Sequence, residues 1–254
     1  MMNIVVCVKH AVDESELRAD PAGRPQLQGA MSKMSNFDRN AVEEAVRVKE
    51  AKSGTVTVVS LGSGEWKKSI KEALAMGCDR AMAVSVSQPL DALATSYFLS
   101  RAVKKVGPVD LVLFSEGASD TYHGLVPPMT AEWLKIPFLG YARKLEVVEG
   151  GLRCELALEE HEEVVEAGLP AVVSVVSEIN SPRYPTLLQI MQASKKPMED
   201  VTIDSLKDAD LPASGVSVDE VHVVSVSRKR VIFEGTPEDC SRNLVDAMRK
   251  EGLL

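Results

Sequence analysis

The side chains that could take part in chemistry gather at the ends of two apolar runs. Lys9 closes the first run, Asn3–Lys9, and the second run is Val109–Ser115. Residues 117–128, GASDTYHGLVPP, follow the second run and lead into a helical pattern, whose N-terminus presents free N–H groups and partial positive charge. If the two runs are neighbouring parallel strands where the strand order reverses, their carboxyl ends border a ligand crevice. An adenine nucleotide suits such a crevice, and a surface loop without a ligand is the alternative.

Other chemistry-bearing patterns are missing. There is no P-loop motif, and Gly62-Ser63-Gly64 indicates an ordinary turn into a helix, because Lys67 stands where a dinucleotide fingerprint needs its third glycine. No GxSxG motif or Cys/His pair suggests a nucleophile, so we expect no catalytic residue. We also expect no metal site, because the cysteines and histidines lack metal-ligand spacing. These residues are Cys7, Cys78, Cys154, Cys240, His10, His123, His161 and His222.

The composition restricts the classes of protein and partner. The 254 residues carry 29 Lys and Arg against 37 Asp and Glu, and this net charge of −8 argues against a nucleic-acid partner. Apolar runs such as Leu169–Val176 are much shorter than the ~20 residues of a transmembrane helix, so we expect no transmembrane segment. The N-terminus lacks the pattern of a signal peptide, and the scattered cysteines suit a reducing compartment. We therefore expect a cytoplasmic location.

Alternating apolar and amphipathic stretches predict an α/β fold with a doubly wound, mostly parallel sheet of the adenine nucleotide-binding type. If the strand order of this sheet is 3-2-1-4-5, the crevice lies between the carboxyl ends of strands one and four. Asp91 is a candidate N-cap and Gly77 a candidate helix stop. The predicted strands are Asn3–Lys9, Thr55–Ser60, Arg80–Val86, Val109–Ser115 and Leu169–Val176, and the predicted helices are Asp38–Lys52, Glu65–Met76, Asp91–Val106 and Pro127–Leu134.

The pattern changes in the second half of the chain. Phe138–Val148 and Leu152–Leu158 flank Gly150-Gly151 and predict an added β-hairpin, which Glu163–Val165 would extend. Residues 180–215 lack a clear period, so we expect an extended tail there, followed by a short strand at Val221–Val226. We therefore divide the chain into an α/β domain with its hairpin, residues 1–179, and an extended part, residues 180–254.

The last residues predict an amphipathic helix. Thr236-Pro237-Glu238-Asp239 supplies an N-cap, a proline in the first turn and two acidic residues near the helix N-terminus. Leu244, Val245 and Met248 then form a narrow apolar stripe. Because the linker before this helix is poorly patterned, we expect an extended C-terminal arm that reaches onto another chain.

Seven stretches of the sequence, in order along most of the chain, resemble one family. They are VVCVKHAVDE, NFDRNAVEEAVRVKE, VVSLG, ALAMGCDRA, DALATSYFLSRAV, LPAVVSVVSEINSPRYPTLLQIMQASKKP and FEGTPEDCSRNLVDAMRKEGLL. The chain is thereby similar to the beta subunit of electron transfer flavoproteins. The most specific stretches are AVEEAVRVKE, ALAMGCDRA and NSPRYPTLLQIMQASKKP.

The resemblance implies an electron carrier subunit rather than an independent enzyme. Its partner is then an alpha subunit that mainly holds the electron-carrying FAD, and this chain holds AMP or a second FAD. The implied donors are acyl-CoA dehydrogenase-type enzymes of fatty acid oxidation, and the implied acceptor is one such as a quinone oxidoreductase. Two alternatives stay open: an electron-bifurcating subunit working from NADH to ferredoxin and an enoyl-CoA reductase partner, and a non-redox adenine nucleotide-binding module.

The resemblance also assigns residues to two sites by position. Residues that follow PRY form the implied recognition loop for dehydrogenases, with a local helix packed on the core as the alternative. The implied dehydrogenase contacts are Tyr184, Leu187, Leu188, Ile190, Met191, Lys195 and Lys196. The implied nucleotide contacts are Cys7, Val8, Lys9, Ser35, Asn36, Phe37, Leu61, Gly62, Asp120, Thr121, His123, Gly124, Leu125 and Val126.

The nucleotide loop departs from the family pattern in a way that bears on the ligand. Leu125 replaces a glutamine amide, and Pro127 and Pro128 each lack an N–H donor. Missing donors weaken the binding of a diphosphate more than that of a monophosphate, which favours AMP over FAD. Asp91 and Thr95 favour FAD, because DALATS resembles the helix entry of the bifurcating type. AMP, a second FAD and an empty site remain open, with AMP expected first.

Overall fold

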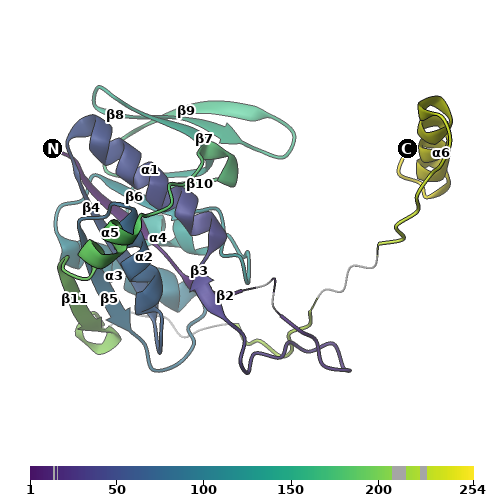
Figure 1. The fold of residues 1–254 in the computed structure, drawn as a ribbon. Helices are drawn as coiled ribbons and strands as arrows, with labels where there is room; N and C mark the ends of the chain where they lie inside the picture. The colour runs from purple at the N-terminus through teal and green to yellow at the C-terminus, as the bar shows by residue number, and fades with distance from the viewer. Residues whose placement is uncertain (14, 16, 208–215, 224–227) are drawn as a thin grey trace.

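The computed structural model describes residues 1–13, 15, 17–207, 216–223 and 228–254. A nine-stranded sheet forms its centre, in the order β11-β5-β4-β1-β6-β10-β7-β8-β9 (Figure 1). The bounds of its strands are β1 Asn3–Cys7, β4 Thr55–Gly62, β5 Arg80–Ser85, β6 Leu111–Ser115, β7 Phe138–Val148, β8 Gly151–Ala157, β9 Glu162–Gly168, β10 Ala171–Val175 and β11 Met198–Thr202. A separate antiparallel pair joins β2 His10–Val12 to β3 Ser32–Met34.

The helices are α1 Asn36–Lys52, α2 Lys67–Met76, α3 Ala92–Val106, α4 Val126–Leu134, α5 Leu187–Ala193 and α6 Pro237–Lys250. α1 and α2 cover one face of the sheet, and α3 and α4 cover the other. Successive side chains of β1 enter opposite layers: Ile4 and Val6 pack with α1 and α2, whereas Val5 and Cys7 pack with α3 and α4. Burial on both faces explains why the central strands are continuous apolar runs.

The sheet confirms the predicted α/β class and the predicted strand order 3-2-1-4-5, which the sheet shows as β5-β4-β1-β6-β10. β5, β4, β1 and β6 are parallel neighbours, and β10 and β7 continue the parallel set. β8 and β9 then pair antiparallel with β7, which confirms the hairpin and its extension. Predicted and observed element bounds differ by a few residues at most in this part of the chain.

Two predicted helix signals are confirmed in detail. Asp91 caps α3 by accepting a hydrogen bond from the Ala94 N–H at 2.7 Å. Gly77 ends α2 with φ 135°, and a Cβ atom there would lie 2.9 Å from a methyl group of Val46 on α1. Glycine is therefore needed at residue 77 both for its backbone conformation and for the close approach of the two helices.

The prediction of a tail without core structure from residue 180 to 215 is wrong in its middle part. α5 packs beside α2, and β11 joins the sheet edge parallel to β5, with Met198 paired to Ala81 and Thr202 to Ser85. Only one of its five side chains, Val201, is buried, so β11 lacks the apolar run that marks the central strands. The predicted strand Val221–Val226 is also wrong at residues 221–223, which form no strand, and its remainder lies outside the described residues.

The C-terminal helix α6 lies apart from the sheet (Figure 1). It has the predicted Thr236 cap, which accepts a hydrogen bond from the Asp239 N–H, and its acidic first turn. None of its residues is buried, and Leu244 and Val245 are exposed. Among the described residues, no helix combines the length and apolar character needed to cross a bilayer.

Candidate functional site

The loops that follow β1 and β6 meet at the carboxyl edge of the sheet. β1 and β6 are paired directly, with Val6 opposite Leu113. Beyond the strand ends, the Lys9 ammonium lies 2.7 Å from an Asp120 carboxylate oxygen and 3.3 Å from the Thr121 hydroxyl. The structure thus brings together the two loops that the sequence analysis placed around a nucleotide, and it neutralises much of the Lys9 charge within the chain itself.

Asp38, which the sequence analysis did not assign to the site, joins the same two loops. Its carboxylate accepts a hydrogen bond from the Lys9 N–H at 2.7 Å and one from the Ser115 hydroxyl at 2.5 Å. Burial raises the pKa of Asp38 to about 7, although both hydrogen bonds act to lower it. An acidic residue in the first turn of a helix, directly after the assigned Ser35-Asn36-Phe37, was the available sequence signal.

Ser35 and Ser119 form a second link at this edge. The buried Ser35 hydroxyl accepts a hydrogen bond from the Ser119 N–H at 3.2 Å, and the Ser35 N–H donates to the Lys9 carbonyl at 3.1 Å. The Ser119 hydroxyl is buried and has no hydrogen-bond partner in the described structure. A buried hydroxyl without a partner is costly, so this group is available for a polar atom of a ligand.

The loop of residues 120–125 is held by aromatic and backbone contacts. The Tyr122 hydroxyl donates to Glu116 at 2.7 Å, and this bond, followed by burial, raises the pKa of Tyr122 to about 12. The Tyr122 ring lies 5.5 Å from the ring of Phe37. Gly124 has φ +64°, and a Cβ atom there would lie 3.4 Å from the Glu116 carbonyl oxygen. His123 and Leu125 are exposed.

The N-terminus of α4 offers few donors to a phosphate. Val126, Pro127 and Pro128 occupy its first three positions, so Val126 alone carries an N–H group among them. The next N–H, from Met129, already donates to the Leu125 carbonyl at 3.2 Å. Leu125 precedes the helix without capping it through its side chain. The two prolines thus remove the donors that make most helix N-termini good phosphate sites.

The remaining predicted nucleotide contacts are strand-end and helix-entry residues. Cys7 and Val8 are buried, and Asn36 is exposed beside Arg39, which donates to its side-chain carbonyl. Leu61 and Gly62 close β4, and a Cβ atom on Gly62 would lie 2.6 Å from Trp66. Asp91 uses its carboxylate to cap α3, and its carbonyl accepts the Thr95 N–H at 2.9 Å. They lie at the carboxyl ends of β1, β4 or β5 or beyond them, except Asn36, which begins α1 after β3.

Three groups at this edge carry hydrogen atoms that a phosphate oxygen accepts: the Ser119 hydroxyl, the Val126 N–H and the Lys9 ammonium. Gly124 has no side chain that would keep a ligand away from the backbone. Asp120 opposes additional negative charge. A surface groove of about 440 Å³ lies elsewhere, between α1 and β7, and none of the predicted nucleotide contacts lines it.

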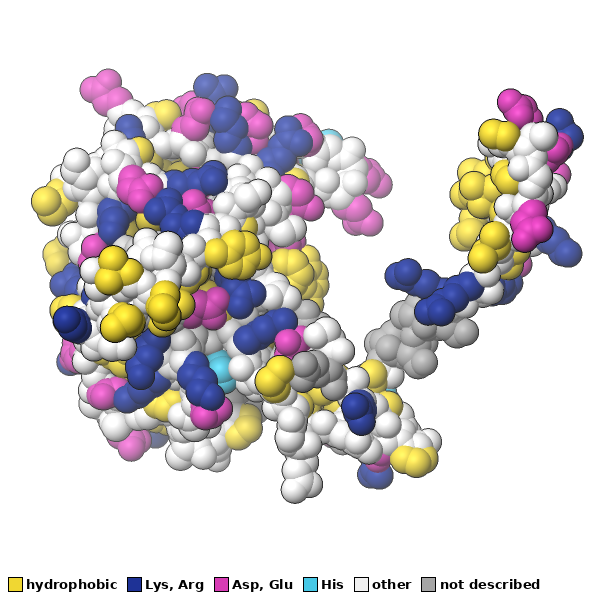
Figure 2. Space-filling view, in the orientation of Figure 1, with side chains coloured by type: hydrophobic (Ala, Val, Ile, Leu, Met, Phe, Trp, Pro, Cys, Tyr) yellow, Lys and Arg dark blue, Asp and Glu magenta, His cyan; other side chains and the backbone are white. Residues whose placement is uncertain are grey.

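The segment predicted to contact dehydrogenases exposes its apolar side chains. Tyr184 is 89% exposed, and the exposed fractions on α5 are 74% for Leu187, 64% for Leu188, 50% for Ile190 and 64% for Met191. A gathering of hydrophobic side chains over α5 is visible in Figure 2. α5 does pack beside α2, as the alternative of a core-packed helix expects, but Ala193 is its one buried residue and its other apolar side chains stay exposed. Lys195 is exposed, whereas the Lys196 ammonium contacts backbone carbonyls of this chain.

Comparison with known proteins places the chain in a family. Residues 27–206 match the family model of the electron transfer flavoprotein domain. The chain is also 33% identical to the electron transfer flavoprotein subunit beta of Thermoanaerobacterium thermosaccharolyticum, with all of both chains covered. It is 32% identical to that of Bacillus subtilis, again over both full lengths. It is 35% identical to that of Clostridium acetobutylicum, over 92% of this chain and 91% of the relative.

The chain belongs to the electron transfer flavoprotein beta subunits. Membership confirms the resemblance that the seven stretches carried, and it gives the chain a role in electron transfer in association with a flavin. An alpha subunit is the partner that a beta subunit implies. The two regions of this beta subunit that could bind a ligand or a partner are the carboxyl-edge loops and α5.

Proposed function

We propose that this beta subunit works with its alpha subunit as a carrier that accepts electrons from acyl-CoA dehydrogenase-type enzymes and passes them to an acceptor such as a quinone oxidoreductase. The exposed apolar face of α5 carries this proposal, because apolar side chains flanked by charge are typical of transient interfaces. The redox chemistry belongs to the FAD, which the alpha subunit mainly holds. The residues of this chain orient and dock, and none of them is assigned a catalytic step. A cytoplasmic location goes with this role.

AMP is the nucleotide that we assign to the carboxyl edge. The Lys9 ammonium, the Ser119 hydroxyl and the Val126 N–H are the polar groups that would hold its single phosphate. Asp38 would hold the two loops in place, since it binds the backbone of Lys9 and the side chain of Ser115. A diphosphate needs more donors than Pro127 and Pro128 leave at α4.

The second candidate is an electron-bifurcating subunit that holds a second FAD in place of AMP. The observation that favours it is the entry of α3, where Asp91 caps the helix and Thr95 lies in its first turn, as in the sequence pattern of that type. The sparse donors of α4 oppose it. A non-redox adenine nucleotide-binding module is the weakest candidate, because α5 and α6 present apolar side chains that such a module does not need.

Quantifying the bound nucleotides tests these assignments. The beta subunit is co-expressed with its alpha subunit, the purified heterodimer is denatured, and the released FAD and AMP are measured against protein. One FAD and one AMP per heterodimer is the expected result. Two FAD would assign the chain to the bifurcating type, one FAD without AMP would mean that the altered loop has abolished the site, and no flavin at all would overturn the electron-carrier role.

A further inference from the structure

Residues 180–196 form a segment that leaves the sheet after β10 and returns to it at β11. Its middle part, α5, is a helix of only seven residues with a capping box between Thr186 and Gln189. A helix this short is not stable by itself in water, because helix nucleation is unfavourable. Ala193 is its one buried residue, so packing against α2 holds α5 only at its C-terminal end, and polar contacts at both ends of the segment add to this packing.

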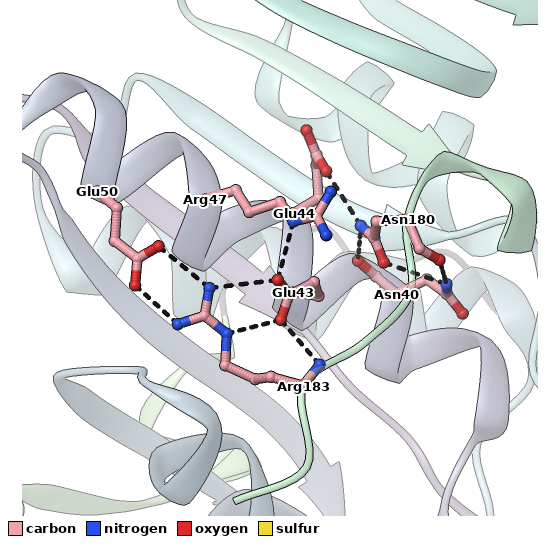
Figure 3. A network of polar contacts seen from close by, with 7 residues as sticks. All are labelled: Asn40, Glu43, Glu44, Arg47, Glu50, Asn180 and Arg183. Carbon is pink, nitrogen blue, oxygen red and sulfur yellow. Dashed lines mark hydrogen bonds and ion pairs between the residues drawn. The ribbon is translucent and has the colours of Figure 1, made fainter.

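The first attachment lies at the start of the segment, where Arg183 contacts two glutamates of α1 (Figure 3). Its Nε and Nη2 atoms donate to Glu43 at 2.8 and 3.2 Å, and its Nη1 and Nη2 atoms donate to Glu50 at 2.7 and 3.1 Å. The backbone N–H of Arg183 also donates to Glu43 at 3.1 Å. The planar guanidinium thus binds both carboxylates in the paired geometry that fixes orientation as well as charge.

Glu43 holds Arg183 in a fixed place, because its carboxylate is buried in the body of the protein. Burial acts to raise the pKa of Glu43, but hydrogen bonds from Arg183 and Arg47 outweigh it, and the pKa is lowered. Asn180 adds a reciprocal contact: its amide donates to the Asn40 carbonyl and to Glu44, both at 3.0 Å, and the Asn40 amide donates back to the Asn180 carbonyl at 2.8 Å. Residues 180–183 are therefore fixed to α1.

The second attachment lies at the end of the segment. The Lys196 ammonium donates to the carbonyl oxygens of Leu74 at 2.8 Å and Cys78 at 2.6 Å, at the C-terminal end of α2. A cation at the C-terminus of a helix also interacts favourably with the helix dipole. Ala193, which is 2% exposed, adds apolar contact just before this point.

We propose that Arg183 and Lys196 are positioning residues that hold α5 preformed, with its apolar face turned outward, before a partner arrives. This inference rests on the proposed docking function of α5. Because both ends of the segment are already attached, α5 is ordered before docking. A binding element that is already ordered loses less conformational entropy when it binds. The two cations act through the placement of α5 and need not touch the partner.

Hydrogen exchange in the heterodimer tests the attachments without any dehydrogenase. In Arg183→Gln, the amides of residues 186–194 should exchange about 10-fold faster than in the unmodified protein, because the short helix loses one anchor. Arg47→Gln is the matched control: Arg47 also pairs with Glu43, at 2.8 Å, but it belongs to α1 itself. It should leave exchange in residues 186–194 unchanged. Glu50→Gln leaves the Arg183–Glu43 pair intact and should give a smaller increase in the exchange rate of residues 186–194. It keeps the test decisive if Arg183→Gln does not fold.

Electron transfer tests the consequence for docking. With an acyl-CoA dehydrogenase as donor, Arg183→Gln and Lys196→Gln should each raise the heterodimer concentration for half-maximal rate about 10-fold, with the maximal rate unchanged, since only the ordering of α5 is altered. Flavin content should match that of the unmodified heterodimer. Arg183→Lys, which retains the charge but not the paired geometry, should give an intermediate value.

Three results would overturn the proposal: unchanged exchange in Arg183→Gln and Glu50→Gln, equal effects of Arg183→Gln and Arg47→Gln, or faster exchange with no rise in the half-saturating concentration. The last result counts against it only where Leu187→Ala with Leu188→Ala does slow transfer. If that double substitution has no effect while exchange in Arg183→Gln rises, the attachments stand, and the assignment of α5 as the docking surface fails instead.

Discussion

α5 and α6 both present apolar side chains to solvent, but the protein holds them in different ways. α5 is attached at its two ends through Arg183 and Lys196, which contact α1 and α2. α6 has no buried residue and lies away from the sheet (Figure 1). The difference indicates two kinds of contact. A preformed surface suits a partner that binds and leaves, whereas an arm that lies apart from the sheet of its own chain suits a permanent neighbour.

The largest expected effect is on the assembly of the heterodimer. Replacing Leu244 and Val245 with glutamate should lower the affinity between the beta and alpha subunits at least about 100-fold, because two apolar side chains lose their burial and two charges enter the interface. Sedimentation or size-exclusion titration measures it. Asn243→Glu with Lys250→Glu is the control, since both residues are exposed on the other side of α6. Equal affinities for the two double variants would contradict a role for the stripe.

The docking surface should give the next largest effect. Leu187→Ala with Leu188→Ala should raise the heterodimer concentration for half-maximal electron transfer from the dehydrogenase about 10- to 30-fold, since two exposed apolar anchors are truncated. The flavin content should stay the same, because none of the predicted nucleotide contacts belongs to α5. Stopped-flow reduction of the flavin measures the rate. A transfer rate equal to that of the unmodified protein at every concentration would refute the assignment of α5.

The beta subunit by itself should show the contrast directly. In hydrogen exchange, the amides of α6 should be protected less than about 10-fold, because a helix of 14 residues without packing is marginal. Those of α5 should be protected more strongly. Addition of the alpha subunit should raise protection of α6 and leave α5 unchanged. Strong protection of α6 in the free beta subunit would remove the distinction drawn between the two helices.

The smallest expected effect is a change in the pH dependence of stability. It distinguishes Asp38, at the N-terminal end of α1, from Glu43, the residue of α1 to which Arg183 binds. Burial raises the pKa of Asp38 to about 7, so the folded state favours its protonated form. The stability from this group is fully present below its ordinary pKa of 3.8 and is lost as pH rises toward about 7. Asp38→Asn should therefore flatten the fall of unfolding free energy over this range, by at most about 1.4 kcal/mol per pH unit.

Two charged groups near Asp38 also act on its pKa. The positive charge of Lys9 acts to lower the pKa of Asp38, and the negative charge of Asp120 acts to raise it. At the other end of α1, the pKa of Glu43 is lowered, so the Arg183 attachment should persist throughout this range and weaken only in acid. A pH slope for Asp38→Asn equal to that of the unmodified protein, in urea titrations between pH 4 and 7, would contradict the assignment.

The sequence by itself determined the elements whose pattern is local. Short apolar and β-branched runs identified β1, β4, β5, β6 and β10, because strands buried on both faces are composed mainly of apolar residues. Helix caps at Asp91 and Thr236, and the stop at Gly77, were legible because capping depends on a few neighbouring residues. The apolar group of α5 and the departures at Leu125, Pro127 and Pro128 are likewise visible in the amino-acid sequence alone.

Only the tertiary structure decided the features that join distant residues. β11 joins the sheet through backbone pairing with β5. Most of its side chains are not buried, so its sequence lacks the apolar pattern that would have predicted a strand. The Arg183–Glu43 contact spans 140 positions, and Asp38 meets Ser115 across 77. Burial is what gives these charged groups their significance, since a carboxylate at the surface and one inside the protein are the same letter in the sequence. Which groups become buried together depends on how the sheet and helices pack, and no local pattern records it.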